Sequence, residues 1–143
     1  MKEQFFCSAE FCIFSKVITA QEMMKYFSIE PTRFYEKGTP LSQRNPKSKR
    51  RETAHWILES QLKEVEPLHL HIENLISLIE NHADINGLKK IASDCKFEMY
   101  CGYFFEYPNS KDVILIDSYL LKRLTAIPID ISISLYPADP DEI

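Results

Sequence analysis

Residues 129–136 (IDISISLY) alternate without interruption between apolar and polar side chains. Successive side chains of a β-strand point to opposite faces of a sheet, so this pattern predicts a strand with one buried and one solvated face. Residues 97–107 show the same alternation, with one face made of Phe97, Met99, Cys101, Tyr103, Phe105 and Tyr107. Strands of this kind require a second layer that covers their apolar faces.

Residues 68–79 predict the clearest helix of that second layer. Their apolar side chains recur at spacings of three and four and make one buried stripe, which consists of Leu68, Ile72, Leu75, Ile76 and Ile79. The box T-x-x-E from Thr19 to Glu22 predicts another helix start, in which hydroxyl and carboxylate each accept a free amide hydrogen. Asp84 and either Asp117 or Ser118 are expected to cap two short helices.

We therefore predict a single α+β domain over residues 1–143. Strands are expected at 11–15, 55–60, 97–107, 113–116 and 129–136, and the third and fourth are expected to form a hairpin across the turn PNSK. Helices between strands favour a mixed or antiparallel sheet with helices packed on it, with ferredoxin-like βαβ elements. A chain of 143 residues is long enough to bury a core without disulfides or metal.

A flexible basic loop is predicted at 39–53, and a frayed acidic tail at 137–143. The loop holds five of the 17 basic residues, namely Arg44, Lys47, Lys49, Arg50 and Arg51, so 12 basic residues face 21 acidic ones in the rest of the chain. Such a cluster could contact phosphate groups or serve as the docking point of a partner. Because it lacks interleaved aromatic residues and the acidic remainder would repel a polyanion, we expect a solvated loop and no direct binding of nucleic acid.

The uninterrupted apolar runs are no longer than about four residues, as at 113–116, so we expect no membrane-spanning helix. The N-terminal segment carries Glu3 and Glu10 around a very short apolar stretch, which does not resemble a signal peptide. Cytoplasmic localisation is therefore expected. The four cysteines lack CxxC spacing, and most stand among strand-like apolar residues, so we expect small buried hydrophobic side chains.

Motifs of catalysis and of cofactor binding are missing from the sequence. The three glycines are widely separated, which excludes a G-x-G-x-x-G turn and a P-loop, and neither G-x-S-x-G nor H-E-x-x-H occurs. His69 and Glu73 share one helix face, but a pair at this spacing is usually an ordinary surface interaction. The sequence predicts no metal site, no cofactor and no enzymatic activity.

The run ITAQEMMKYFSIEPTRFYEKGTP, followed by HWILES and LHLHIENL, resembles the domain of unknown function family 4279. The matching residues are Thr19, Ile29, Pro31, Thr32, Lys37, Gly38, Trp56, Leu58, Ser60, His71 and Leu75. The resemblance covers about residues 10–80, with a weaker one near the C-terminal third, and Phe27-Ser28 stands where the family has Leu-Gly. It implies membership and no particular activity.

Two interpretations of the loop after the first helix stay open. Arg33, Lys37 and Trp56 could line a pocket for an anionic ligand, which would make the chain a small-ligand-binding or regulatory domain. Alternatively, Pro31 and Gly38 shape turns and Trp56 fills the core.

The leading functional hypothesis is a protein-binding module, most concretely an immunity protein that neutralises a cognate bacterial toxin by occluding its active site. Members of the resembled family are similar in size and compactness to other immunity proteins. Many such toxins are basic nucleases, and an acidic inhibitor captures a basic partner quickly. The expected contact residues are the acids Glu98, Glu106 and Asp130, with Tyr100 and Phe104 as apolar anchors.

Overall fold

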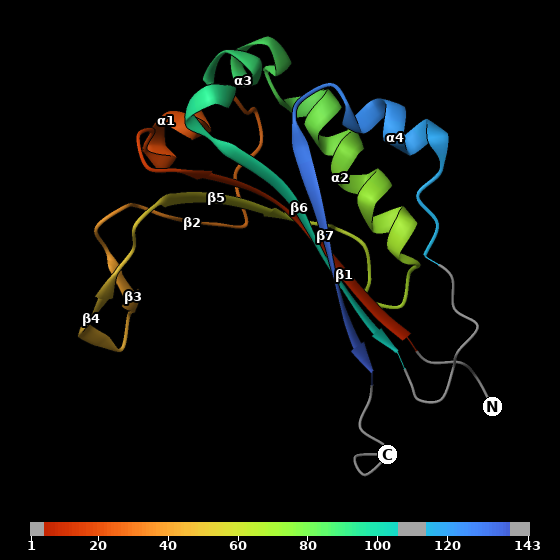
Figure 1. The fold of residues 1–143 in the computed structure, drawn as a ribbon, viewed down its shortest axis with the longest axis horizontal. Coiled ribbons are helices and arrows are strands. Elements are labelled where there is room, and N and C mark those ends of the chain that lie inside the picture. The colour runs from red at the N-terminus through yellow and green to blue at the C-terminus, as the bar shows by residue number, and fades with distance from the viewer. Residues whose placement is uncertain (1–4, 106–113, 138–143) are drawn as a thin grey trace.

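A mixed five-stranded sheet forms one layer of the fold (Figure 1). The computed structural model describes residues 5–105 and 114–137. The strands of this sheet are β1 Phe5–Ser15, β2 Arg33–Tyr35, β5 Ala54–Glu59, β6 Lys96–Phe105 and β7 Ile129–Pro137. They lie in the order β2-β5-β1-β6-β7, and every neighbouring pair is antiparallel except β6 and β7, which are parallel.

The described helices lie together on one side of this sheet (Figure 1). They are α1 Ala20–Met24, α2 Leu68–His82, α3 Ile85–Ile91 and α4 Ser118–Leu124, with a short 3₁₀ helix at Ala92–Asp94. The strand β6, the helix α4 and the strand β7 form one βαβ unit, which explains why these two strands are parallel. The predicted α+β class with helices packed on a mixed sheet is confirmed.

The core lies between the two layers, as the alternating patterns predict. Its main members are helix-facing side chains of β1, β5 and β6 together with the predicted apolar stripe of α2. Each of these side chains is at most 5% exposed: Phe11, Ile13, Trp56, Leu58, Phe97, Met99, Leu68, Ile72, Leu75, Ile76 and Ile79. Trp56 lies at the centre, where its ring stacks on Phe27 at a centroid distance of 3.9 Å and meets the edge of Phe11 at 6.2 Å.

The start of α1 is capped by residues from two parts of the chain. Thr19 Oγ1 accepts a hydrogen bond from the backbone N–H of Glu22 at 3.1 Å, as expected. The carboxylate that binds further free amides here belongs to Glu36, which accepts from the backbone N–H of Ala20 at 2.6 Å and from that of Gln21 at 3.3 Å. The long-range carboxylate therefore ties the segment after β2 to this helix.

The position where the resembled family has Leu-Gly is occupied by Phe27 and Ser28 without backbone strain. No described residue other than glycine has a positive φ, so Ser28 adopts an ordinary conformation. Its backbone N–H donates to the carbonyl of His82 at 2.8 Å, and Phe27 forms an isolated antiparallel bridge with Ala83. The turn after α1 is thus fixed against the end of α2.

The predicted strand at 113–116 and its hairpin with 97–107 are wrong. Residues 114–116 form no strand, and Val113 lies outside the described residues. Ile114 and Ile116 are partly buried against the core, whereas Leu115 is 65% exposed. The segment therefore buries one side without pairing as a strand. The strand β6 instead pairs with β1 on one side and β7 on the other.

The expectation of a loop throughout 39–53 is also wrong, because residues 40–50 contain a separate two-stranded hairpin. Its strands are β3 Pro40–Ser42 and β4 Asn45–Arg50, and it stands apart from the helices at one end of the sheet (Figure 1). The side chains of β4 are mostly exposed on both faces, so no alternating pattern marks the strand. Arg51, just after it, places its guanidinium 3.7 Å from the ring centroid of Tyr35. The strand β7 includes Pro137, the first residue of the predicted tail at 137–143, and residues 138–143 lie outside the described residues.

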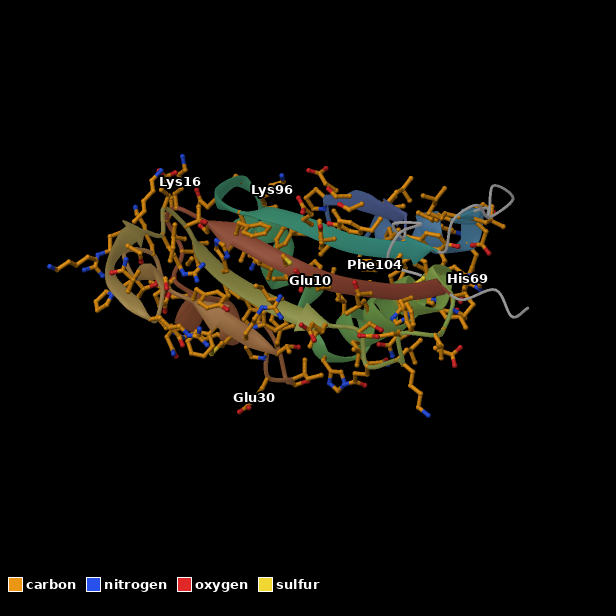
Figure 2. The ribbon with its side chains drawn as sticks, turned by 90° about the horizontal axis from the view of Figure 1, so that it is seen from below. Glu10, Lys16, Glu30, His69, Lys96 and Phe104 are labelled. Atoms are coloured by element: carbon orange, nitrogen blue, oxygen red, sulfur yellow. The ribbon has the colours of Figure 1, made fainter. Side chains whose placement is uncertain are left out.

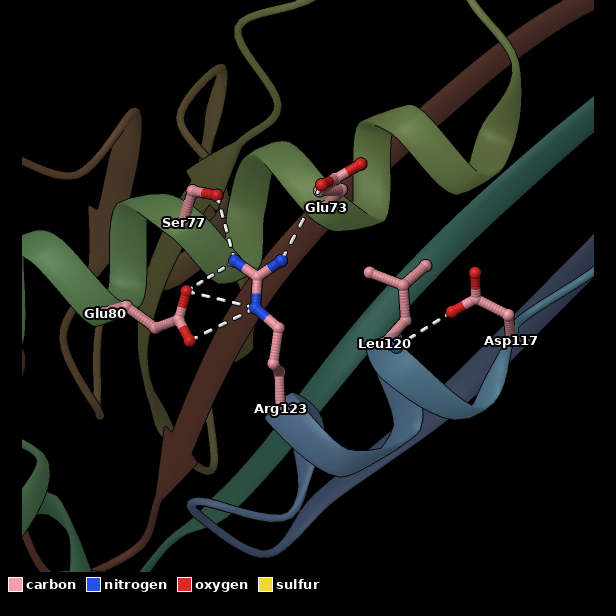
Figure 3. A network of polar contacts seen from close by, with 6 residues as sticks. All are labelled: Glu73, Ser77, Glu80, Asp117, Leu120 and Arg123. Atoms are coloured by element: carbon pink, nitrogen blue, oxygen red, sulfur yellow. Dashed lines mark hydrogen bonds and ion pairs between the residues drawn. The ribbon is translucent and has the colours of Figure 1, made fainter.

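Arg123 connects α4 to α2 through a polar network (Figure 3). Its guanidinium is bidentate to the carboxylate of Glu80, donates to Ser77 Oγ at 3.1 Å and lies 3.7 Å from the carboxylate of Glu73. The side chain of Arg123 is only 15% exposed, while both glutamates are more than 40% exposed. The guanidinium is therefore largely shielded from water, and the network holds the short α4 against α2.

Replacing Arg123 with alanine is expected to lower the free energy of unfolding by about 1–2 kcal/mol, because the charged hydrogen bonds to α2 are lost while the exposed glutamates stay hydrated. Urea denaturation of Arg123→Ala and of the wild type measures this difference. Lys122→Ala changes an exposed residue of the same helix and should shift stability by much less. Equal losses in both variants would show that the network contributes nothing specific.

Candidate functional site

The face of the sheet opposite the helices is not covered by any helix of the described part of the chain, and we call it the open face. Figure 2 looks onto it, with the strands in front of the helices and Glu10, Lys96 and Phe104 labelled on them. It is formed by the second set of alternating side chains, since these positions point away from the core. The set includes Phe6, Ser8, Glu10, Cys12, Phe14, Arg33, Tyr35, His55, Ile57, Glu59, Lys96, Glu98, Tyr100, Phe104, Asp130, Ser132, Ser134 and Tyr136.

Three aromatic side chains cross the open face in register, and we call them the aromatic row: Phe6, Phe104 and Tyr136. Phe104 and Tyr136 stack at a centroid distance of 4.5 Å, and each member of the row is 42–45% exposed. The Tyr136 hydroxyl lies 3.0 Å from that of Tyr100, which also lies 3.2 Å from Ser134 Oγ. The result is an exposed apolar strip with polar hydroxyl groups beside it.

Gly102 allows the Phe104 ring to lie flat along this strip. A Cβ atom at Gly102 would lie 2.9 Å from Ser8 Oγ and 3.2 Å from the Phe104 ring, closer than ordinary contacts. The missing side chain therefore makes room for the aromatic row on the open face.

Carboxylates outnumber basic groups on the rest of the open face. The carboxylates of its strands are Glu10, Glu59, Glu98 and Asp130, and the cations are Arg33 and Lys96, with Arg51 as a third cation over the ring of Tyr35. Arg33 forms ion pairs with both Glu10 and Glu59, and Lys96 lies 3.2 Å from the carboxylate of Glu98. Each of these two cations is thus already paired, and Asp130 on the edge strand is exposed. The surface is accordingly negative toward an approaching partner.

A pocket of about 510 Å³ opens where β5 ends and the following connection runs along β1. The open face contributes Ser8, Glu10, Arg33 and Tyr100 to its lining, and the connection to α2 contributes residues that include Ser60, Glu64 and His71. The size is within the range of small-molecule sites. Its lining holds more carboxylates than cations, which disfavours the anionic ligand that the sequence suggested.

Ser60 and His71 are the closest approach to a nucleophile–base pair in this pocket. Ser60 Oγ lies 2.8 Å from His71 Nδ1 and also accepts a hydrogen bond from the backbone N–H of Leu62 at 3.2 Å. No carboxylate hydrogen-bonds His71 within the described residues, so the orienting third group of a hydrolytic triad is missing there. The pair instead fixes the connection between β5 and α2.

Burial lowers the pKa of His71, while the carbonyl groups of Glu66 and Lys63 and the charge of Glu66 act in the opposite direction. Burial likewise lowers the pKa of His55, and the charge of Arg51 adds to that effect. Both groups bind a proton more readily in the unfolded chain, whose histidine pKa is 6.5. Stability should therefore fall as the pH decreases through and below that value.

The variant His71→Asn is expected to lose less stability than the wild type between neutral pH and about pH 5, because one buried histidine no longer has to be protonated on unfolding. Urea midpoints at both pH values measure the difference. His69→Asn, two residues earlier and exposed, is the matched control and should keep the pH dependence of the wild type. An unchanged dependence in His71→Asn would contradict this account.

Arg33, Lys37 and Trp56 do not line a common pocket. Trp56 has no exposed surface and faces the helices, whereas Arg33 lies on the open face between two carboxylates. Lys37 is exposed beyond the end of β2 and donates to the carbonyl of Lys16 at 3.1 Å. Of the three, only Arg33 lines the pocket described above.

Tyr100, Phe104, Glu98 and Asp130 do share one face, and Glu106 lies outside the described residues. The contact residues expected from the sequence do not include Phe6, Tyr136 and Glu10, which lie beside them. The alternation of β7 could have indicated Tyr136, because it has the same parity as Asp130. To identify Phe6 and Glu10, the register between β1 and β6 would have to be known, and that register is not encoded in a local sequence pattern.

The thiols of Cys12, Cys95 and Cys101 are not activated, because the pKa of each is raised. Cys7, Cys12 and Cys101 are buried, and Cys95 is partly buried. Burial raises the pKa of Cys12, which also lies near Glu10 and Glu98, and burial raises the pKa of Cys101 to about 12. A nucleophilic thiol needs a lowered pKa. Across residues 5–105 and 114–137, no three histidine, cysteine or acidic side chains are grouped as metal ligands.

No helix in the described ranges is long and apolar enough to cross a membrane. Comparison with the curated proteins and with the solved structures finds no significant match to this chain. A family model does match, and its description is "Domain of unknown function (DUF4279)". The match covers residues 3–138, which include the sheet, the helices and the open face. The chain therefore belongs to the DUF4279 family, as the motifs around Pro31 and Trp56 indicated.

Proposed function

We propose that this protein is a protein-binding module that uses its open face to bind a basic partner protein. The observation that carries the proposal is the aromatic row, because three large rings remain 42–45% exposed while the opposite side of β1 and β6 is almost fully buried. Large apolar patches that stay exposed and are bordered by polar groups commonly mark interaction surfaces.

The composition of the open face suits a protein partner. Aromatic side chains such as Phe104 and Tyr136 contribute large contact areas at little conformational cost and are frequent among interface hot spots. The hydroxyl groups of Tyr100 and Ser134 beside them can hydrogen-bond to a partner's polar groups. Such a surface combines an apolar centre with a polar surround.

The charge of the open face indicates the sign of the partner. Carboxylates outnumber cations on this face, and the whole chain has a formal net charge of −4. A basic partner would be attracted over several ångströms and oriented by the acids of β6 and β7. The most concrete function of this kind is that of an immunity protein, which neutralises a cognate bacterial toxin, such as a basic nuclease, in the cytoplasm by occluding its active site.

The pocket beside Arg33 supports a second candidate, a small-ligand-binding or regulatory domain. Glu10, Glu59 and Glu64 line it together with one arginine, so it would favour a cationic or neutral polar ligand. A shift of the melting temperature by small amines, without any protein partner, would favour this candidate.

The test of the proposal is co-purification of the tagged protein with the product of the neighbouring gene, followed by calorimetric titration of the purified pair. We expect a one-to-one complex of nanomolar affinity that weakens as the salt concentration rises. An assay of the partner's activity then distinguishes an immunity protein from another binding module, since only the former abolishes that activity. Failure of the two proteins to associate at low salt would refute the proposal.

A further inference from the structure

The two edges of the sheet differ strongly in length. The strand β2 at one edge has three residues, whereas β7 at the other has nine and pairs only with β6 among the described residues. Every second residue of an edge strand directs its N–H and C=O groups away from the sheet, where another strand can bind them. The long edge at β7 is therefore open to pairing.

The strand β7 lacks the features that usually prevent edge-to-edge pairing. Residues 129–137 contain no lysine or arginine, Asp130 is the single charged residue, and the one proline stands at the end of the strand. The register with β6 is continuous over the whole strand, so no bulge twists the edge away. By contrast, the short β2 presents little edge to a neighbour.

The helix-facing side chains of β7 are incompletely buried. Ile129, Ile131 and Ile133 are only partly buried against the core, and Leu135 is 58% exposed. The corresponding residues of the neighbouring strand β6, Phe97, Met99 and Cys101, are at most 1% exposed. An additional strand beyond β7 would complete the burial of this apolar row.

We propose that β7 pairs with β7 of a second copy of this chain, antiparallel and about a two-fold axis at Ile133. This register pairs all nine residues, because Ile133 is the midpoint of the strand. Ile131 then lies opposite Leu135 of the second copy on the helix side, and Asp130 lies opposite Tyr136 on the open face. Directly opposed residues share a face, so the apolar and polar sides of both sheets stay continuous.

The charges of the strand agree with this occupant. Asp130 meets a neutral tyrosine, and no like charges face each other in this register. The dimer would contain one continuous ten-stranded sheet, and the two open faces would form a single surface. A symmetric pair of this type is the commonest form of homo-oligomer. Because one strand pair buries a small area, we expect a weak and reversible dimer.

Sedimentation of the full chain over a range of concentrations tests the inference without any partner protein, so its outcome is independent of the proposed function. We expect a monomer–dimer equilibrium, with a dissociation constant at least about tenfold higher for Leu135→Lys, which places a charge opposite Ile131 of the second copy. Val65→Lys replaces a similarly exposed apolar residue outside the sheet and should leave the equilibrium unchanged. A monomer at every concentration overturns the inference, as does a dimer that Leu135→Lys leaves intact.

The register is tested by a single cysteine at the two-fold axis. Ile133→Cys should form a disulfide-linked dimer under mild oxidation, because the residue faces its own counterpart at the distance of directly opposed residues. Leu135→Cys faces a different residue and should cross-link far less, and the wild type reports any contribution of the native cysteines. Cross-linking that is equal in the two variants and the wild type would contradict the proposed axis.

Discussion

Replacement of Trp56 with alanine is expected to lower the free energy of unfolding by about 3–5 kcal/mol. The side chain has no exposed surface, and it packs between Phe27 at 3.9 Å and Phe11 at 6.2 Å. Removing it would leave a large cavity at the junction of α1, α2 and the sheet. Domains of this size unfold with about 5–15 kcal/mol, so the loss would consume a large part of the total.

Two further variants separate packing from polarity. Trp56 Nε1 is buried and has no hydrogen-bond partner among the described residues, so Trp56→Phe removes an unsatisfied group and should cost clearly less than alanine. Phe34 is the cross-strand neighbour of Trp56 on β2 but is 43% exposed, and Phe34→Ala should cost less still. Urea unfolding of all three variants gives the comparison. A small loss for Trp56→Ala would mean that the site is plastic, as a ligand pocket would be.

Side-chain alternation predicted which face of β6 and of β7 lies toward the helices. In β6 and β7 the odd-numbered residues face the helices and the even-numbered ones the open face, as the sequence pattern required. This success has a local cause, because the two-residue period of a strand is present in the chain itself. The same reasoning placed Tyr100, Phe104, Glu98 and Asp130 on one surface.

Strand pairing could not be predicted in the same way. The segment at 113–116 is as apolar as a strand, yet β6 pairs with β1 on one side and with β7 on the other and has no free edge. The hairpin at 40–50 shows the reverse case, since β4 is exposed on both faces and its residues give no periodic signal. Pairing depends on which distant segments occupy each edge, and that information is not local.

The candidate site shows the same division. Arg33 and Trp56 are near each other on adjacent strands but have opposite parity in the register, because Arg33 pairs with Ile57 and Phe34 with Trp56. The two side chains therefore lie on opposite faces of the sheet. Whether the second face carries helices could not be read from the alternation, since exposed aromatic residues such as Phe104 are compatible with either arrangement.

If the open face binds the partner, Phe104→Ala should raise the dissociation constant of the complex by about 30-fold or more, which corresponds to the 2 kcal/mol that defines an interface hot spot. Phe104 is 43% exposed, so the variant should remain folded with a nearly unchanged melting temperature. Calorimetric titration against the same partner measures the effect. The loss should be expressed mainly in the dissociation rate, because the long-range charge of the face is unaltered.

The matched control is Leu121→Ala on the exposed side of α4, where an apolar side chain is 48% exposed but lies in the helical layer. It should leave the affinity unchanged. Asp130→Asn should instead slow association and reduce the salt dependence, since it removes an exposed charge while keeping the shape of the side chain. Equal losses of affinity in Phe104→Ala and Leu121→Ala would place the interface elsewhere, because a partner seated on the open face cannot touch the opposite layer.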